Sequence, residues 1–183
     1  MVLVTPVGAT APVARALIAH QDAPRAIEAI APTKLPGGGI FMLISDMMSP
    51  NVVSITPDET AALAARLLYR HNIGALPVCG EDGKLRGMLT DRDIVLRCVA
   101  AESDPATTPV KEIMSKGIVS VSPNDDVRVA SRIMAAEQVR RLPVLSDDKV
   151  VGMVSLGDLA KTQAFDMEAS KALSEISTNV KKK

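Results

Sequence analysis

GMLTDRD at Gly87–Asp93 recurs as GMVSLGD at Gly152–Asp158, and this recurrence is the strongest indication of the architecture. Upstream of them, Leu76–Val78 (LPV) returns unchanged as Leu142–Val144 at an offset of 66 residues, whereas the two glycine-to-aspartate motifs lie 65 residues apart. The lost residue falls in the polar stretch Gly80–Lys84, where a hairpin turn tolerates a deletion. These matches indicate that the chain is built from two copies of one unit.

Each copy opens with the same signals for a strand and a helix. A short β-branched segment, Val52–Ile55 in the first copy and Ile118–Val121 in the second, predicts a strand. It leads to Thr56-Pro57-Asp58-Glu59 or to Ser122-Pro123-Asn124-Asp125. These stretches predict a helix N-terminus with a capping box and with proline at the first helical position.

Two strands around a turn and a closing helix complete each copy. The predicted strands are Ala75–Cys79 with Leu85–Leu89, and Arg141–Leu145 with Val150–Val154. The predicted closing helices run from Asp91 to about Val99 and from Leu156 to about Ala164, and short lead-in helices precede the copies at Leu43–Met48 and Val110–Met114. The order strand, helix, strand, strand, helix predicts an α/β (α+β) fold.

The repeat divides the chain into a leader, two copies, a linker and a tail. The leader is rich in Ala and Pro, and we expect it to be disordered. The tail predicts an amphipathic helix that carries Met167, Leu173 and Ile176 on one face and is followed by three lysines. The expected boundaries are residues 1–42 for the leader, 43–100 and 110–165 for the copies, 101–109 for the linker and 166–183 for the tail.

Composition and charge exclude several classes of function. Lys plus Arg and Asp plus Glu are equal at 21 each, and aromatic residues make up 2% of the chain, so we expect no nucleic-acid surface. No apolar run reaches the roughly 18 residues that a membrane span needs, and the first 20 residues lack a basic region followed by an apolar one, so we expect a soluble protein that is not secreted. The only cysteines are Cys79 and Cys98, a usage that fits a reducing cytoplasm.

The sequence also indicates no catalytic or metal centre. His20 and His71 are the only histidines, so neither a metal cluster nor a nucleophile with its base can be assembled from sequence neighbours. We therefore expect no enzyme activity, no metal and no cofactor.

The duplicated unit resembles the CBS-domain family, and in particular small bacterial proteins that consist of one CBS pair. The likeness rests on the Leu-Pro-Val strand and the glycine-to-aspartate motif, present twice in register, and covers residues 43 to about 165. It implies two copies packed about a pseudo-twofold axis, with two related clefts for adenosine-containing ligands such as AMP, ADP or ATP. It also implies that Thr90 with Asp93, and Ser155 with Asp158, hold the ribose and a nearby phosphate.

These four residues have a second explanation, because Thr90-x-x-Asp93 and Ser155-x-x-Asp158 are also typical of capping boxes. The hydroxyl would then cap its helix, and its loss would cost about 1 kcal/mol of stability. An ionised carboxylate can equally accept hydrogen bonds from both hydroxyls of a ribose diol. The two roles can coexist, and the sequence leaves both open.

The copies differ just before the central strand. Gly74-Ala75 in the first copy aligns with Arg140-Arg141 in the second, where guanidinium groups either hold a phosphate in a forked contact or are merely solvated. Arg92 is a further phosphate candidate, because the second copy has Gly157 at that position. We therefore expect two inequivalent clefts. The resemblance places four more residues along them, namely Thr56, Ser122, Pro77 and Pro143.

The function that the resemblance implies is a regulatory sensor. Ligand binding would stabilise one arrangement of the pair, and a partner or a homodimer would read the change. The alternative is a structural dimerisation module that binds no ligand. With either function we expect a twofold homodimer that buries apolar helix faces.

Overall fold

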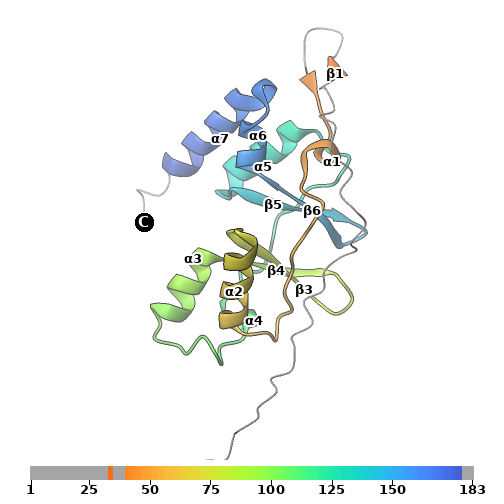
Figure 1. Cartoon of the computed structure of the whole chain (residues 1–183). Helices are drawn as coiled ribbons and strands as arrows, with labels where there is room; N and C mark the ends of the chain where they lie inside the picture. The colour runs from red at the N-terminus through yellow and green to blue at the C-terminus, as the bar shows by residue number, and fades with distance from the viewer. Residues whose placement is uncertain (1–32, 35–39, 179–183) are drawn as a thin grey trace, which may run out of the picture.

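The computed structural model describes residues 33–34 and 40–178 and consists of two similar halves, each with one antiparallel hairpin and its own helices (Figure 1). The first hairpin joins β3 (Ala75–Cys79) to β4 (Leu85–Thr90), and the second joins β5 (Arg141–Ser146) to β6 (Lys149–Ser155). The sequence predicted all four strands, and the α+β fold class is confirmed. We call the half that contains the first hairpin repeat 1 and the half that contains the second hairpin repeat 2.

The predicted leader lies largely outside the described residues. What the structure describes of it is a short antiparallel hairpin of β1 (Thr33–Lys34) and β2 (Ile40–Phe41), followed by Met42. Met42 is buried in the core of repeat 2.

The hairpins of the two repeats match in detail. Both carry a register shift at the same place, between Val78 and Cys79 in repeat 1 and between Val144 and Leu145 in repeat 2. The tips of the hairpins meet, because Lys84 Nζ lies 2.9 Å from Asp148 Oδ2. The turn between β5 and β6 is the place where the second copy is one residue shorter, as the sequence predicted.

The prediction of a strand before each first helix was wrong. Ile55 makes only an isolated parallel bridge to Val78, and Val121 makes the equivalent bridge to Val144. In repeat 1 the bridge consists of Ile55 N–H donating to the Pro77 carbonyl at 3.1 Å and Cys79 N–H donating to the Ile55 carbonyl at 2.9 Å. In each segment the bridge to the hairpin is isolated and is not extended into a ladder, so no strand forms.

The predicted helix starts at Pro57 and Pro123 were also wrong. The helices begin four residues later, as α2 (Ala61–His71) and α5 (Val127–Glu137), with Thr60 and Asp126 as their N-caps. Thr56 and Ser122 instead precede turns, and their carbonyls accept hydrogen bonds from Glu59 N–H and Asp125 N–H. The reason is a contact between segments that are distant in sequence. The Glu59 carbonyl accepts a 2.7 Å hydrogen bond from Val110 N–H, so the backbone just before α2 is bonded to the lead-in helix of the second copy and not to its own helix.

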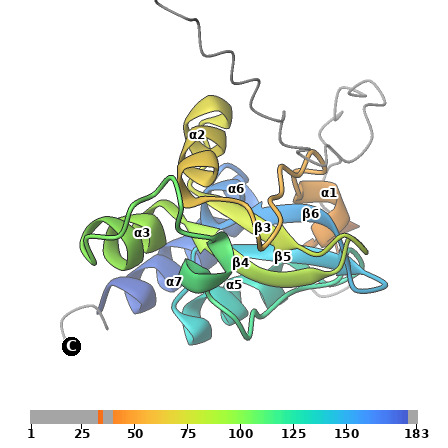
Figure 2. The same ribbon diagram turned by 90° about the horizontal axis from the view of Figure 1, so that it is seen from below.

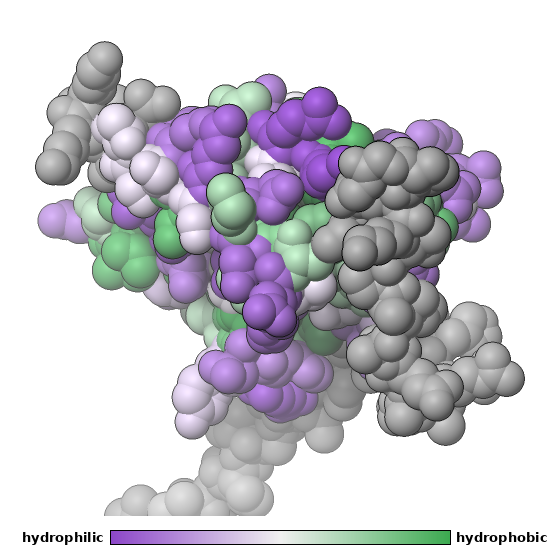
Figure 3. Space-filling model, turned by 90° about the horizontal axis from the view of Figure 1, so that it is seen from above, coloured by the Kyte–Doolittle hydropathy of each residue, from purple (hydrophilic) through white to green (hydrophobic). Residues whose placement is uncertain are grey.

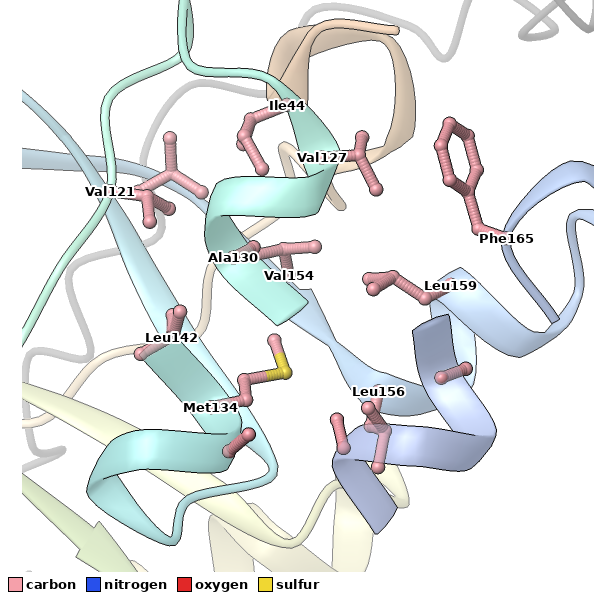
Figure 4. Packing of buried hydrophobic residues seen from close by; sticks show 14 of the residues in the cluster. Ile44, Val121, Val127, Ala130, Met134, Leu142, Val154, Leu156, Leu159 and Phe165 are labelled. Carbon is pink, nitrogen blue, oxygen red and sulfur yellow. The ribbon is translucent and has the colours of Figure 1, made fainter. Parts of the chain in front are cut away.

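Each lead-in helix packs on the other repeat. α1 (Ile44–Met47) precedes repeat 1, yet Ile44 is fully buried in the core of repeat 2 beside Val127 and Val121 (Figure 4). α4 (Val110–Ile113) precedes repeat 2, and Val110 is fully buried in the core of repeat 1. The two repeats therefore complete each other's cores.

The closing helices are irregular, and the tail forms one more helix. α3 (Asp91–Ile94) continues into a π-helical turn, η1 (Val95–Val99), whereas α6 (Leu156–Ala160) leads through the 3-10 turn η2 (Gln163–Phe165) into α7 (Asp166–Thr178). α7 packs against α5 and α6 at the end of the molecule occupied by repeat 2 (Figure 1). Viewed from that end, the surface is mostly hydrophilic (Figure 3).

The tail is helical as predicted, but its predicted apolar face was partly wrong. Ile176 is buried, whereas Met167 is 84% and Leu173 48% exposed. Ala169 and Ala172 are buried instead, because their small side chains allow the helix to lie close to α5 and α6. The lysine tail, residues 181–183, lies outside the described residues.

Candidate functional site

A cavity of about 380 Å³, here called the first cleft, lies between the two repeats. Repeat 1 contributes Gly74 and Ala75 at the start of β3 and the segment from Thr90 to Asp93. Repeat 2 contributes Arg140 and Arg141 at the start of β5 and the crossover segment 115–119. Groups separated by some fifty residues in sequence therefore meet in one cavity.

Thr90 and Asp93 form a complete capping box at the start of α3. Asp93 Oδ2 accepts hydrogen bonds from Thr90 N–H at 2.9 Å and from the Thr90 hydroxyl at 2.7 Å, and Thr90 Oγ1 accepts one from Asp93 N–H at 3.1 Å. Asp93 Oδ1 lies 3.4 Å from Arg97 Nη2, and the Asp93 side chain is 15% exposed. One carboxylate oxygen thus holds the helix, and the other faces a cation.

Ser155 and Asp158 repeat this geometry at the start of α6. Asp158 Oδ2 accepts from Ser155 N–H at 2.9 Å and from the Ser155 hydroxyl at 2.6 Å. The cation beside Oδ1 is here Lys161, 3.5 Å away. The capping boxes that the sequence indicated are therefore present in both repeats.

A second cavity, of about 440 Å³ and here called the second cleft, adjoins the first. Ser155 and Gly157 line it, but Asp158 does not. One wall belongs to α7, which contributes Ser170 and Leu173. The two clefts differ in their walls, since α7 lines only the second one, and the sequence did not predict this wall.

Arg140 and Arg141 line both clefts, together with Asp91. The Arg141 guanidinium reaches across to repeat 1, where Nη2 would lie 3.1 Å from a side-chain carbon at Gly74. A glycine at position 74 therefore leaves room for this guanidinium at the junction of the two clefts.

The other predicted site residues divide into two groups. Gly74, Ala75 and Arg92 line the first cleft. Pro77 and Pro143 are buried within the hairpins, where their carbonyls accept hydrogen bonds from Ile55 and Val121. Those two prolines, with Thr56 and Ser122, do not line either of the clefts described above.

Sequence reasoning missed Lys116, which lines the first cleft from the crossover segment. Its position just after a lead-in helix was the available signal, but no local pattern shows that the segment after this helix pairs with repeat 1, as Ser115 does with Met88. With Lys116, the first cleft carries four cationic residues against three acidic ones: Arg92, Lys116, Arg140 and Arg141 against Asp91, Asp93 and Glu137. The cavity therefore has a slight excess of positive charge, suited to an anionic group.

Two further properties bear on the kind of site. Within residues 33–34 and 40–178, no group of three or more His, Cys, Asp or Glu side chains is placed to hold a metal ion. No helix in that part of the chain is both long and apolar enough to cross a membrane.

The fold and the site define a tandem α+β module with an interdomain cleft that presents hydroxyl, carboxylate and guanidinium groups. The sequence profile of the CBS domain matches residues 44–99 and 110–164. The chain therefore belongs to the CBS-domain family, as its resemblance implied, and stand-alone proteins of this family are generally regulatory modules without catalytic activity.

Several relatives share this organisation over most of their length. The CBS domain-containing protein YhcV of Bacillus subtilis is 46% identical over 134 residues, which are 73% of this chain and 94% of YhcV. Hypoxic response protein 1 of Mycobacterium tuberculosis is 41% identical over 116 residues, 63% of this chain and 81% of the relative.

Solved structures confirm the fold. The crystal structure of hypoxic response protein I with two coordinated zinc ions superposes with a TM-score of 0.62 at 40% identity, covering 66% of this chain and 98% of that one. The CBS domain pair of protein MJ0100, in complex with 5-methylthioadenosine and S-adenosyl-L-methionine, superposes with a TM-score of 0.61 at 27% identity, covering 66% and 94%.

Proposed function

We propose that this chain is a regulatory sensor that binds an adenosyl ligand in the first cleft. The observation that carries the proposal is the meeting of Asp93 from repeat 1 with Arg140 and Arg141 from repeat 2 in one cavity. A carboxylate suits the hydroxyls of a ribose, and guanidinium groups suit a phosphate. MJ0100, which has the same fold, holds two adenosyl compounds in its crystal structure.

The assignment of groups follows from the capping geometry. Asp93 Oδ2 is occupied by Thr90, so the ribose hydroxyls would bind Oδ1, where they would replace or share the 3.4 Å contact with Arg97. The phosphate would then point toward Arg140 and Arg141. A ligand that contacts both repeats stabilises one arrangement of the pair, which is the sensing step.

The competing function is a structural dimerisation module without a ligand. The observation in its favour is that both carboxylates already have capping partners within the chain. The buried free thiols of Cys79 and Cys98 suit either function, and for both we propose a reducing, cytoplasmic location.

The test is a ligand panel against the full chain. Adenosine, AMP, ADP, ATP and S-adenosylmethionine are added in turn, and the melting temperature and the heat of binding are measured. A ligand at about 100 times its dissociation constant should add about 2.7 kcal/mol of stability. Guanosine monophosphate serves as the control for unspecific phosphate binding. If no adenosyl compound raises the melting temperature more than this control, the structural module is the correct function.

A further inference from the structure

Arg97, on the π-helical turn η1, is the cation that faces the second carboxylate oxygen of Asp93. Its Nη2 lies 3.4 Å from Asp93 Oδ1, and its Nη1 donates a 2.9 Å hydrogen bond to the Ile113 carbonyl on α4. α3 and η1, which carry Asp93 and Arg97, lie at the outer edge of the molecule in both ribbon views (Figures 1 and 2). One guanidinium group therefore contacts both the motif aspartate and the lead-in helix α4.

The contact with α4 holds Arg97 beside Asp93. Ile113 is the last residue of α4, and at a helix C-terminus the carbonyls lack partners within the helix and a cation is favoured. Asp93 and Arg97 are four residues apart, a spacing that brings two side chains of a helix together. The guanidinium group is thus kept near Oδ1 both by its own helix and by α4.

Oδ1 of Asp93 is also the oxygen that a ribose needs. Oδ2 already accepts hydrogen bonds from the N–H and the hydroxyl of Thr90, and Asp93 lines the first cleft. Arg97 does not line this cleft, so it acts on a ligand there only through Asp93. The guanidinium group and the ribose hydroxyls therefore compete for one carboxylate oxygen.

We propose that Arg97 is a positioning residue that lowers the affinity of the first cleft, because it holds Asp93 Oδ1 while the cleft is empty. The proposal rests on the adenosyl function proposed above. An exposed ion pair between residues four apart on a helix shifts an equilibrium about twofold, and a stronger surface pair about fivefold. The Arg97 side chain is 46% exposed and that of Asp93 15%. We therefore expect Arg97 to weaken the binding of an adenosyl ligand by about two- to fivefold.

Repeat 2 does not share this arrangement. Thr162 aligns with Arg97 at the offset of 65 residues, and the cation beside Asp158 is Lys161, whose side chain is 80% exposed. Asp158 does not line either cleft described above. The competition therefore concerns Asp93, and Lys161 provides a matched control.

The first experiment compares Arg97→Gln with the wild type by calorimetric titration of the full chain with adenosine. Glutamine is uncharged but has an N–H donor for the Ile113 carbonyl, and adenosine has no phosphate that would respond to the lost charge. Arg97→Gln should bind adenosine about two- to fivefold more tightly, a gain that damage to the fold would not produce. Lys161→Gln should leave the affinity unchanged.

The outcomes separate this proposal from the adenosyl function. Equal or weaker binding of adenosine by Arg97→Gln overturns the role of Arg97 alone. In the background of Asp93→Asn the gain should disappear, because the two residues act through one contact. Should neither the wild type nor Arg97→Gln bind adenosine or AMP, the adenosyl function is wrong and the role of Arg97 fails with it.

The second experiment uses the unmodified protein. Salt screens an exposed ion pair, since the Debye length falls from about 30 Å at about 0.01 M to about 3 Å at about 1 M ionic strength. Adenosine is uncharged, so the wild-type affinity for it should rise by up to about fivefold over this range as the contact between Arg97 and Asp93 weakens. The affinity of Arg97→Gln should stay nearly constant. A wild-type affinity that stays constant or falls with salt overturns the proposal, whether or not Arg97→Gln folds.

Discussion

At the scale of single residues, each motif aspartate uses its two carboxylate oxygens for different contacts. Oδ2 of Asp93 and of Asp158 accepts the backbone N–H and the hydroxyl of the cap residue, three positions earlier. Oδ1 faces a cation in both cases. Capping therefore uses only one oxygen of each carboxylate, and of the two aspartates only Asp93 lines a cleft, where its Oδ1 could meet a ligand.

This division makes Asp93→Asn an informative change. Asparagine keeps one oxygen for the cap, so the free energy of unfolding should change little, whereas the loss of charge should weaken adenosyl binding by about 1.5–3 kcal/mol. Calorimetric titration of both proteins measures the difference. Asp158→Asn is the matched control, because Asp158 does not line either cleft described above and its loss should weaken binding less. Equal affinity of wild type and Asp93→Asn would show that Asp93 only caps its helix.

The second prediction about single residues concerns Arg140 and Arg141 and the recognition of phosphate. Since Arg140 and Arg141 lie where the clefts join, their joint replacement by alanine should remove the preference for AMP over adenosine. Adenosine itself should bind nearly as before, because the guanidinium groups act on phosphate. Titrations of the two ligands against wild type and double mutant give the comparison, and a parallel loss for both ligands would assign the pair a structural role.

At the scale of the elements, the first helix of repeat 2 depends on a charged cap. Asp126 Oδ1 accepts from Arg128 N–H at 2.8 Å, and the Arg128 guanidinium contacts both carboxylate oxygens at 2.7 and 2.8 Å. The hydrogen bonds from Arg128 hold the pKa of Asp126 below its ordinary value. In repeat 1 the neutral hydroxyl of Thr60 serves as the cap instead.

The lowered pKa predicts the sign of a pH effect. The unfolded chain binds a proton at Asp126 at higher pH than the folded chain does, so the stabilisation is complete above about pH 4 and is lost as the pH falls through the folded pKa. At pH 7, Asp126→Ala should cost about 1–2 kcal/mol of unfolding free energy. Urea unfolding at pH 7 and pH 3 measures the difference between the two proteins, which should shrink at pH 3. For the matching change Thr60→Ala the cost should not vary with pH.

At the scale of the whole molecule, the exchange of lead-in helices joins the repeats into one unit. The crossing segments approach the hairpins closely: a side-chain carbon at Gly87 would lie 2.6 Å from the Ser115 carbonyl oxygen, and one at Gly152 would collide with Met48 Sδ. The motif glycines thus leave room for the crossing chain. We expect both repeats to unfold in a single cooperative transition.

Ile44→Ala tests this coupling. Ile44 precedes repeat 1 in sequence but is fully buried in repeat 2, so its truncation should cost about 2–5 kcal/mol. Cys98, fully buried in repeat 1, reports on the other half, and its labelling by a thiol reagent should accelerate by the same free energy. If labelling of Cys98 stayed at the wild-type rate while repeat 2 lost stability, the repeats would unfold independently.

Features that depend on neighbours a few residues apart could be predicted from the amino-acid sequence. The duplication, the four hairpin strands and the capping boxes at Thr90 and Ser155 are of this kind, because their hydrogen bonds close within about three residues or across one turn. The family and the existence of α7 were predicted on the same basis.

The places where distant segments meet became visible only in the folded chain. The late starts of α2 and α5 follow from backbone hydrogen bonds to the lead-in segments of the other repeat, such as Val110 N–H to the Glu59 carbonyl. Arg140 and Arg141 line both clefts, and α7 covers repeat 2 with Ala169 and Ala172 instead of Met167, for similar reasons. The physical cause is that a backbone group or a helix face takes whichever partner the packed chain brings to it, and no local pattern records a partner fifty residues away.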